Sequence, residues 1–441
     1  MQKRNSTTKN AIWIISCKVV QSVLGIIISM LSARYLGPSN YGLISYAASI
    51  IAFVIPIVQL GFRSTLVQEI IDNSENEGEI VGTSIFFNLL SSVACIIGVC
   101  TFIYIANPNE PLTFIVCALY SISLLGQALE MIQYWFQAKL ISQYTSIVGL
   151  FAYLTVTIYK TYLLATQKNI CWFAISNAID YFIIAIALIA LYYRLGGQKL
   201  RVSWRRFFVM FSRSKHFIVS SLMVTIFSQT DKIMLKAMLS EESVGIYSAA
   251  VTCAGLTSFV FSAIIDSFRP RVYENKKVSE LMYEKSLISC YSVVIYLSLA
   301  QSLFCTIFSK VIIDVLYGVE YVASANVLCL VVWYTTFSYL GPIRNIWILA
   351  ENKQKYLWII NLSGAVTNIL INGLLIPFMG VMGAALASLI TQIFTNVIVG
   401  FIIKPIRKNN VLMLKGCNPV PLVIYIKQII NKIKRGNMDA Y

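Results

Sequence analysis

The chain has 441 residues, of which 58% are hydrophobic and only 12% are charged, and its formal net charge is +16. Soluble domains carry roughly 25% charged residues, so this composition excludes an ordinary water-soluble fold. The basic charge would suit nucleic acid, but its distribution along the chain explains it without such a partner.

Twelve segments are apolar and long enough to cross a bilayer, because a spanning helix needs roughly 20 apolar residues. None of them alternates with period two, which favours helices over a membrane barrel. We therefore predict an all-α polytopic membrane protein with twelve transmembrane helices. The segments are 11–33, 43–62, 80–106, 112–137, 144–166, 171–193, 217–239, 244–268, 287–308, 324–349, 356–376 and 381–403.

The lysines and arginines are strongly asymmetric across these spans. With both termini placed in the cytoplasm, the cytoplasmic loops and tails hold 27 of the 35 Lys and Arg residues, whereas the external loops hold four. This is the positive-inside pattern of membrane proteins. It predicts an even number of spans and two cytoplasmic termini, and it accounts for the basicity without nucleic acid.

A long basic segment between the sixth and seventh spans divides the chain into two lobes. Residues 1–195 form an N-terminal lobe and residues 217–403 a C-terminal lobe, each with six helices. Between them, residues 196–216 form a cytoplasmic linker in which aromatic residues alternate with arginines, which predicts an in-plane helix on the inner leaflet. Residues 404–441 form a basic cytoplasmic tail. The tail contains an amphipathic helix at 422–435, although a solvated tail that touches anionic lipid fits equally well.

The two halves share short motifs that indicate an internal repeat. Gly42 follows the first span and Gly245 follows the seventh, at an offset of 203 residues, and Trp135 and Trp347 match at an offset of 212. Because each half has six spans, corresponding helices run in the same direction. The repeat is therefore parallel, with its axis along the membrane normal, and transporters built this way bind cargo near the midplane between the halves.

Lys18, Lys160, Lys232 and Arg344 lie inside predicted spans. A cation at membrane depth is costly unless it faces a cavity or a partner, so it marks a functional site by default. We predict that these four, together with Arg34 at the outer end of the first span, line a cationic cavity for an anionic cargo.

Polar residues share helix faces with these cations at steps of three and four. Lys18 on the first span and Lys232 on the seventh both belong to such stripes. Small-residue helix contacts would explain the serines and glycines of these stripes but not the lysines. The polar residues predicted to line the cavity are Ser22, Ser29, Gln127, Tyr153 and Thr225.

Three acids also lie within the spans, namely Glu130, Asp180 and Asp231. Each could bind the H⁺ or Na⁺ that drives transport, or neutralise a buried cation. Pairing of Asp180 with Lys160 is the simpler interpretation. The single histidine and the absence of a C-x-x-C pair or a Walker A loop predict no metal, no other cofactor and no ATP hydrolysis.

The run Ala-Arg-Tyr-Leu-Gly-Pro-x-x-Tyr-Gly at residues 33–42 resembles the polysaccharide transporter family, the Wzx-type O-antigen flippases of the MOP superfamily. Residues 231–247 and 372–385 resemble it as well. The resemblance implies two six-helix lobes around a central cavity, alternating access and no enzymatic activity. It implies a cargo of undecaprenyl-pyrophosphate-linked oligosaccharide, as in O-antigen and lipopolysaccharide biosynthesis, in the bacterial inner membrane. A polysaccharide polymerase, other assembly proteins and membrane lipids would be its partners.

Three other functions stay open. The cavity of a multidrug or cation exporter of the MATE type would favour acids and aromatic residues over lysines. The three intramembrane acids leave this alternative open. A lipid II flippase would carry the same phosphates. A membrane glycosyltransferase or polymerase would need large external loops with catalytic carboxylates, but the longest external loop, near 310–321, is short.

Overall fold

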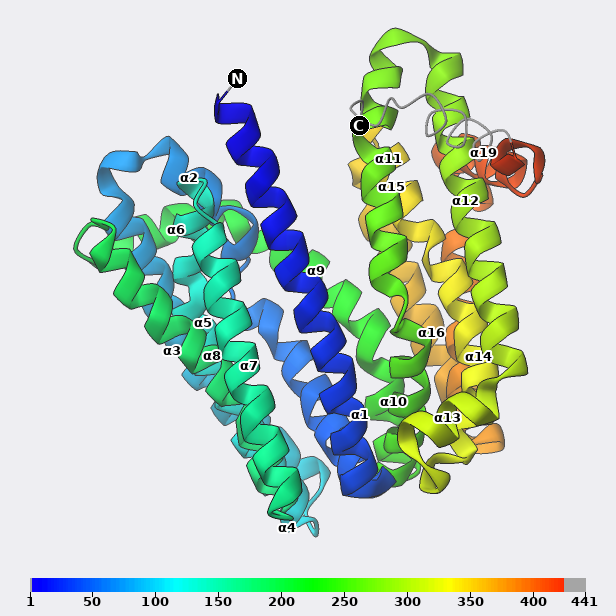
Figure 1. Cartoon of the computed structure of the whole chain (residues 1–441), viewed down its shortest axis with the longest axis horizontal. Helices are drawn as coiled ribbons and strands as arrows, with labels where there is room; N and C mark the ends of the chain where they lie inside the picture. The colour runs from blue at the N-terminus through cyan, green and yellow to red at the C-terminus, as the bar shows by residue number, and fades with distance from the viewer. Residues whose placement is uncertain (1, 424–441) are drawn as a thin grey trace. The chain divides into compact units, whose positions relative to one another are not determined.

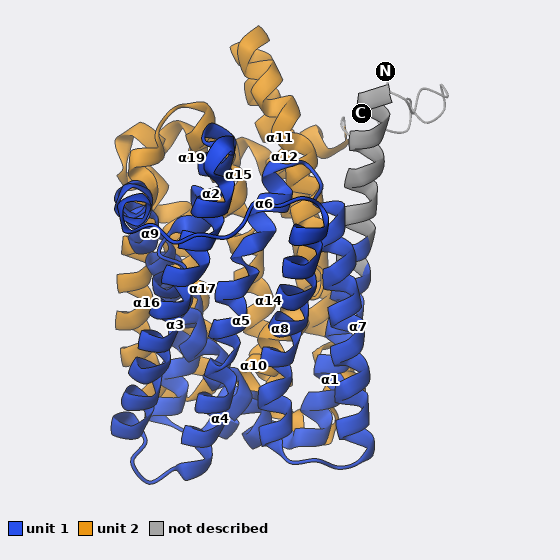
Figure 2. Cartoon of the chain, turned by 90° about the vertical axis from the view of Figure 1, so that its left-hand side faces the viewer, with its two compact units in different colours: residues 1–245 blue, residues 246–441 orange. Residues whose placement is uncertain are grey.

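The computed structural model describes residues 2–423, apart from the side chains of residues 2–16, 18 and 19. All regular structure in this part of the chain is helical, which confirms the predicted all-α fold. The contacts group into two compact units, Met1–Gly245 and Ile246–Tyr441 (Figure 2). The predicted tail helix at 422–435 lies almost entirely outside the described residues.

In the first unit, α7 packs against α1 and α8, α8 packs against α4 and α5, and α9 packs against α1. A core of buried aromatic and aliphatic side chains, which includes Trp135, Phe136 and Tyr192, joins the helices at one end. The elements are α1 (Gln2–Val58), η1 (Phe62–Ser64), α2 (Leu66–Asp72), η2 (Ser74–Asn76), α3 (Glu77–Ala106), α4 (Pro111–Ser121), α5 (Ser123–Leu129), η3 (Glu130–Ile132), α6 (Gln133–Ala138), α7 (Gln143–Ala165), α8 (Ile170–Arg194), α9 (Trp204–Met238) and the first turn of α10 (Glu241–Gly255).

In the second unit, α11 and α12 form a hairpin that projects beyond the other helices of that unit (Figure 1). Close to its turn, the start of α12 is contacted by Lys408, whose Nζ lies 2.6 Å from Glu280 Oε1 and 2.9 Å from Glu284 Oε1. These two carboxylates raise the pKa of Lys408 above its ordinary value. The elements are the rest of α10, α11 (Ser258–Val278), α12 (Glu280–Ile307), α13 (Ser309–Tyr317), η4 (Val319–Tyr321), α14 (Ala323–Ser338), α15 (Leu340–Ala350), η5 (Gln354–Tyr356), α16 (Leu357–Met379), α17 (Val381–Ile393), the π-helix η6 (Phe394–Ile398), α18 (Val399–Ile402), η7 (Lys404–Ile406) and α19 (Arg407–Gly416).

Nine helices in the described part of the chain are long and apolar enough to cross a membrane, or ten if the bent pair α10 and α11 counts as one span. The chain is therefore a multi-pass membrane protein. The spans predicted at 11–33 and 43–62 both lie in the element labelled α1, on either side of its non-helical residue Gly37. The span predicted at 217–239 falls in α9, where Asp231 and Lys232 lower the hydropathy. The twelve spans and the internal repeat are not confirmed and stay predictions.

The helix α1 is interrupted once, at Gly37, whose φ of 70° and ψ of 170° are not helical. Glycine reaches this conformation without a Cβ clash, and the following Pro38 has no backbone N–H to continue the helix. The chain reverses its direction at this point, at the lower end of α1 in Figure 1. The break thus separates the two segments that the sequence predicts as the first and second spans.

The predicted linker lies along the start of α3 instead of standing free. The Arg201 N–H donates to the Gly78 carbonyl (3.2 Å), and the Ser203 N–H donates to Thr83 Oγ1 (3.0 Å). Helix α9 then begins at Trp204 and continues without a break into the predicted seventh span. Phe207 stacks on Phe87 inside the unit, whereas Trp204 and Phe208 are exposed. Only part of the aromatic face is thus available to lipid.

The acidic segment at the start of α3 pairs with basic residues of the same unit. Glu77 lies 2.6 Å from Lys139, and Glu79 lies 3.6 Å from Arg206. These contacts and those of the linker place α9 in the first unit, whereas the predicted C-terminal lobe begins at residue 217. Which segments move together during transport stays a prediction.

Candidate functional site

A polar cavity of 480 Å³ lies among α1, α6, α7 and α8 in the first unit. We call it the amide cavity because three glutamines line it. Its lining combines neutral hydrogen-bonding side chains and a single carboxylate with apolar residues such as Ile184 and Leu188. Its polar lining residues are Gln21, Glu130, Gln133, Gln137, Ser142, Thr145 and Ser146.

A break in the predicted fourth span turns its polar residues toward this cavity. The span consists of α4, α5, the short η3 at Glu130–Ile132 and α6, so the polar stripe does not follow one straight helix. Glu130 and Gln137 reach the cavity, whereas Gln127 is 8% exposed and is buried between helices. The spacing on the sequence predicted this face correctly for part of its length only.

The face of α1 that lines the amide cavity lies one residue before the predicted stripe. Cys17 and Gln21 line the cavity, and Ser22 is exposed. One turn further, Gly25 is so close to α7 that a Cβ there would come within 2.6 Å of the Tyr153 hydroxyl. Ser29, a turn beyond Gly25, is partly buried. The side chain of Lys18 lies outside the described residues.

Lys160 and Asp180 lie on α7 and α8, which pack against each other. Their charges attract, but no ion pair and no hydrogen bond joins them in the described structure. Asp180 Oδ1 and Thr157 Oγ1 are buried without a hydrogen-bond partner. The charge of Asp180 is also felt by Glu130, so the carboxylates and Lys160 form one electrostatic group.

A second cavity, of 380 Å³, contains an arginine that the sequence analysis counted only as a loop residue. We call it the arginine cavity. Arg63 follows the second predicted span and shares the cavity with Gln59, Ser221 and Thr225. Within the described structure Arg63 makes no hydrogen bond and no ion pair, although its charge reaches Glu130. The local signal was its place two residues after Gly61, at the end of an apolar run.

The remaining predicted residues of the first unit lie along α1 and α9. Lys232 is partly buried two turns beyond Thr225 and forms no hydrogen bond or ion pair with a described residue. Its neighbour Asp231 is 6% exposed. Arg34 is exposed near the break in α1. Thr225 is the one of these that lines a cavity.

Arg344 lies in the second unit and is held by its own helices. Its side chain is buried, and Nη1 donates to the Thr395 carbonyl (2.9 Å) and to Asn396 Oδ1 (3.0 Å). Thr395 and Asn396 belong to the π-helix η6, a local irregularity that is frequent at functional sites. The Nε atom has no partner, and no carboxylate of the described chain neutralises the charge.

The first unit therefore brings together hydroxyls, amides, unpaired cations and buried carboxylates between membrane-spanning helices. Hydroxyl and amide groups can hydrogen-bond a sugar, and unpaired lysine and arginine can neutralise phosphate oxygens. The carboxylates can take up a proton or a small cation. None of these groups is arranged as a nucleophile with an adjacent general base.

The family model described as "Polysaccharide biosynthesis protein" matches residues 7–276, more than half of the chain. The chain belongs to this family. The match covers both polar cavities and all of the first unit except its first six residues. No curated protein matches this sequence closely enough to be counted as a relative.

Solved structures show the same fold across almost the whole chain. The lipid II flippase MurJ, in an inward closed conformation, matches with a TM-score of 0.74 and 15% identity over 94% of this chain and 93% of its own. An inward-facing multidrug resistance MATE family transporter of the MOP superfamily matches with a TM-score of 0.66 and 12% identity over 91% and 98%. The eukaryotic MATE transporter AtDTX14 matches with a TM-score of 0.61 and 14% identity over 92% of this chain and 99% of its own. These matches confirm the predicted MOP/MATE-like fold.

Proposed function

We propose that this protein is a flippase for undecaprenyl-pyrophosphate-linked oligosaccharide. It moves the repeat unit of a surface polysaccharide, such as O-antigen, from the inner to the outer leaflet of the bacterial cytoplasmic membrane by alternating access. Both termini lie in the cytoplasm, and a polymerase and other assembly proteins receive the cargo outside. The family match and the MOP-type fold support a transporter of this kind.

The observation that carries the proposal is Arg63, a cation without a described partner in a cavity that also contains Gln59 and four hydroxyl side chains. Arg63 is exposed in this cavity, so its charge is open to an anion that enters it. A pyrophosphate is such an anion, and a guanidinium can bind it in a bidentate fashion. Lys160 and Lys232, which also lack described partners, extend the cationic path along α7 and α9, and Lys18 and Arg34 are placed along α1.

The amide cavity suits the glycan part of such a cargo. Three glutamines and three hydroxyl side chains can exchange hydrogen bonds with sugar hydroxyls, whereas a multidrug pocket would be mostly apolar. The polyprenyl tail needs no polar site, because it can stay in the surrounding lipid. This polar lining supports a glycan over the MATE-type alternative.

The coupling ion binds among the buried carboxylates. Asp180 has an oxygen without a partner and lies near Glu130 on the neighbouring span, so one of the two can take up H⁺ or Na⁺ as the cavity changes its access. Lys160 competes with the coupling ion for the negative charge of Asp180. This arrangement couples ion binding to cargo binding through one electrostatic group, and Asp231 beside Lys232 provides a second candidate.

Lipid II is the second candidate cargo, because a lipid II flippase gives the structural match with a TM-score of 0.74. Both cargoes carry a polyprenyl pyrophosphate and both would use Arg63. They differ in the glycan, so the discrimination lies in the amide cavity. A strain that loses surface polysaccharide but keeps normal peptidoglycan on deletion of the gene would separate them.

The test is glycan display in a deletion strain that carries each variant at matched protein level. Arg63→Ala, Lys160→Ala and Lys232→Ala should each reduce display. The loss of one charge-assisted contact costs about 1.5–3 kcal/mol, roughly tenfold or more in affinity. Arg63→Lys and Lys160→Arg keep the charge and should be milder.

Arg205→Ala is the matched control, because Arg205 is exposed on α9 and forms no ion pair with any described residue, whereas its neighbour Arg206 lies near Glu79. Arg205→Ala should display glycan normally. Full display by the triple variant of Arg63, Lys160 and Lys232 would remove the support for pyrophosphate binding.

A further inference from the structure

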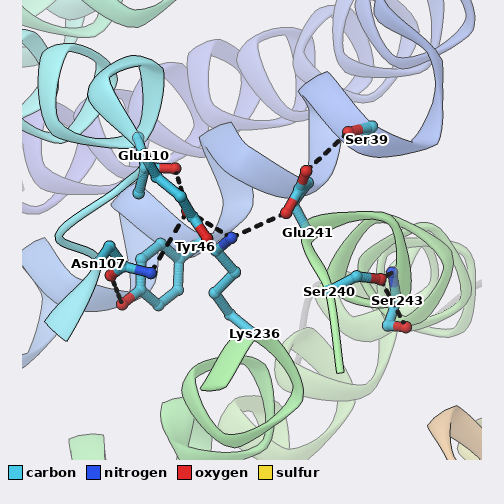
Figure 3. Close-up of polar contacts among 9 residues, drawn as sticks. Ser39, Tyr46, Asn107, Glu110, Lys236, Ser240, Glu241 and Ser243 are labelled. Carbon is cyan, nitrogen blue, oxygen red and sulfur yellow. Dashed lines mark hydrogen bonds and ion pairs between the residues drawn. The ribbon is translucent and has the colours of Figure 1, made fainter. Parts of the chain in front are cut away.

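Lys236, near the end of α9, holds two carboxylates at once (Figure 3). Its Nζ lies 2.7 Å from Glu110 Oε2 and 2.8 Å from Glu241 Oε2. The lysine side chain is 3% exposed, whereas the glutamates are 42% and 39% exposed. Glu110 precedes α4 and Glu241 begins α10, so the three residues join three separate helix ends.

Hydrogen bonds extend this triad to α1 (Figure 3). Ser39, beside the break in α1, donates to Glu241 Oε1 at 3.4 Å. Asn107 donates to Glu110 Oε2 at 3.3 Å and accepts a bond from the Tyr46 hydroxyl at 3.4 Å. The corner of α1, the α3–α4 loop and the α9–α10 corner are therefore fastened at one point.

The backbones of two corners also touch at this end of the unit. A Cβ at Gly42 would overlap the carbonyl oxygen of Glu241, and a Cβ at Gly245 would overlap the carbonyl oxygen of Pro38. Only glycine allows so close an approach. These are the two glycines that the predicted 203-residue offset matches, so the corresponding corners of the two predicted lobes contact each other here.

We propose that Lys236, Glu110 and Glu241 form a latch that closes the outer end of the transport path and opens when the cargo leaves. In the predicted lobe division, Glu110 belongs to the N-terminal lobe, and Lys236 and Glu241 to the C-terminal lobe. Gln137 and Arg63, which line the two cavities, lie at or directly after the ends of their spans that the predicted topology places on the inner side. The role of the latch in glycan export rests on the proposed function. The proposal that the latch closes the outer end of the path does not depend on the cargo.

The charges and exposure of Lys236, Glu110 and Glu241 suit a contact that is stable when closed and can still open. Partial burial acts to raise the pKa of Glu110, but hydrogen bonds from Lys236 and Thr113 bring it below its ordinary value, so the carboxylate stays charged at neutral pH. Both glutamates already touch water. When the helices separate, water replaces each partner, so the step does not leave a charge stranded in an apolar interior.

The test measures access to the arginine cavity from outside and uses no cargo. Thr225→Cys lines this cavity, and a membrane-impermeant maleimide is applied to intact cells, with the protein that lacks Thr225→Cys as the background. Lys236→Met should speed labelling of Thr225→Cys about tenfold or more. Glu110→Gln combined with Glu241→Gln should do the same, and Lys236→Arg should stay near the parent rate.

Glu242→Gln is the matched control, since Glu242 is the exposed neighbour of Glu241 and forms no ion pair; its rate should not change. The latch is refuted if Lys236→Met and the double glutamine variant label at the parent rate while both elute as folded protein. If labelling rises but cargo-site variants leave glycan display intact, the latch stands and the proposed cargo fails.

Discussion

At the scale of single residues, the cations of this protein differ in whether the chain itself neutralises them. Lys236 is held by two glutamates, and Arg344 is held by a carbonyl and an amide. Arg63 and Lys160 have no such partner in the described structure. The first kind holds parts of the chain together, and the second kind is available to an anion.

The two arginines should therefore respond differently to the same substitution. Arg344→Met breaks hydrogen bonds from a buried charged group, each worth about 1.5–3 kcal/mol, so the protein should melt at a lower temperature. Arg63→Met removes no described contact and should leave the melting temperature nearly unchanged. Thermal unfolding of both purified variants in detergent is the measurement. Equal melting temperatures would show that Arg344 has no such structural role.

The sequence indicated the polar faces of α1, α6 and α7 but not the residues that carry the site. The stripe on α1 was predicted through Lys18 and Ser22, yet Cys17 and Gln21 line the cavity, because a shift of one residue turns a helix face by about 100°. Arg63 was missed because its position after a span looks like an ordinary loop. The Lys236 latch was missed because its partner Glu110 is 126 positions away, and no local pattern records such a contact.

At the scale of helices and their corners, the glycines of the α1 and α10 corners decide how closely the backbones meet. Gly245→Ala would place a methyl group against the Pro38 carbonyl, and Gly42→Ala would do so against Glu241. Overpacking of this kind typically costs about 1–3 kcal/mol. We expect both variants to melt at a lower temperature and to label faster from outside.

Gly98→Ala is the control for this prediction. Gly98 lies within α3, and no atom lies within 4 Å of the site where a Cβ would be added. Alanine is favoured over glycine in a helix by roughly 0.5–1 kcal/mol, so this variant should be as stable as the parent or more so. A corner variant as stable as Gly98→Ala would mean that the two corners separate without cost.

The helical class and the positions of most spans followed from apolar length alone. The join of the first two predicted spans did not, because Gly37 breaks α1 without a loop that composition would reveal. The continuity of the linker with α9 also could not be predicted from the sequence. It depends on contacts with α3 between residues far apart in the chain, such as Ser203 and Thr83, which are 120 positions apart.

At the scale of the whole molecule, one fold serves proteins with different cargoes, so the fold alone does not choose among them. The choice rests on the first unit, which contains the amide cavity, the arginine cavity and the latch. A pyrophosphate-linked glycan uses all three, while a cationic drug has no use for Arg63. The central claim is therefore about the chemistry of the cargo.

The most direct measurement is translocation in proteoliposomes that contain the purified protein and a fluorescent polyprenyl-pyrophosphate oligosaccharide. Leaflet exchange should require the protein, should fall about tenfold or more with Arg63→Ala, and should be retained with Arg205→Ala. Exchange that is absent with the native protein, or that is equally fast with Arg63→Ala, would contradict the account.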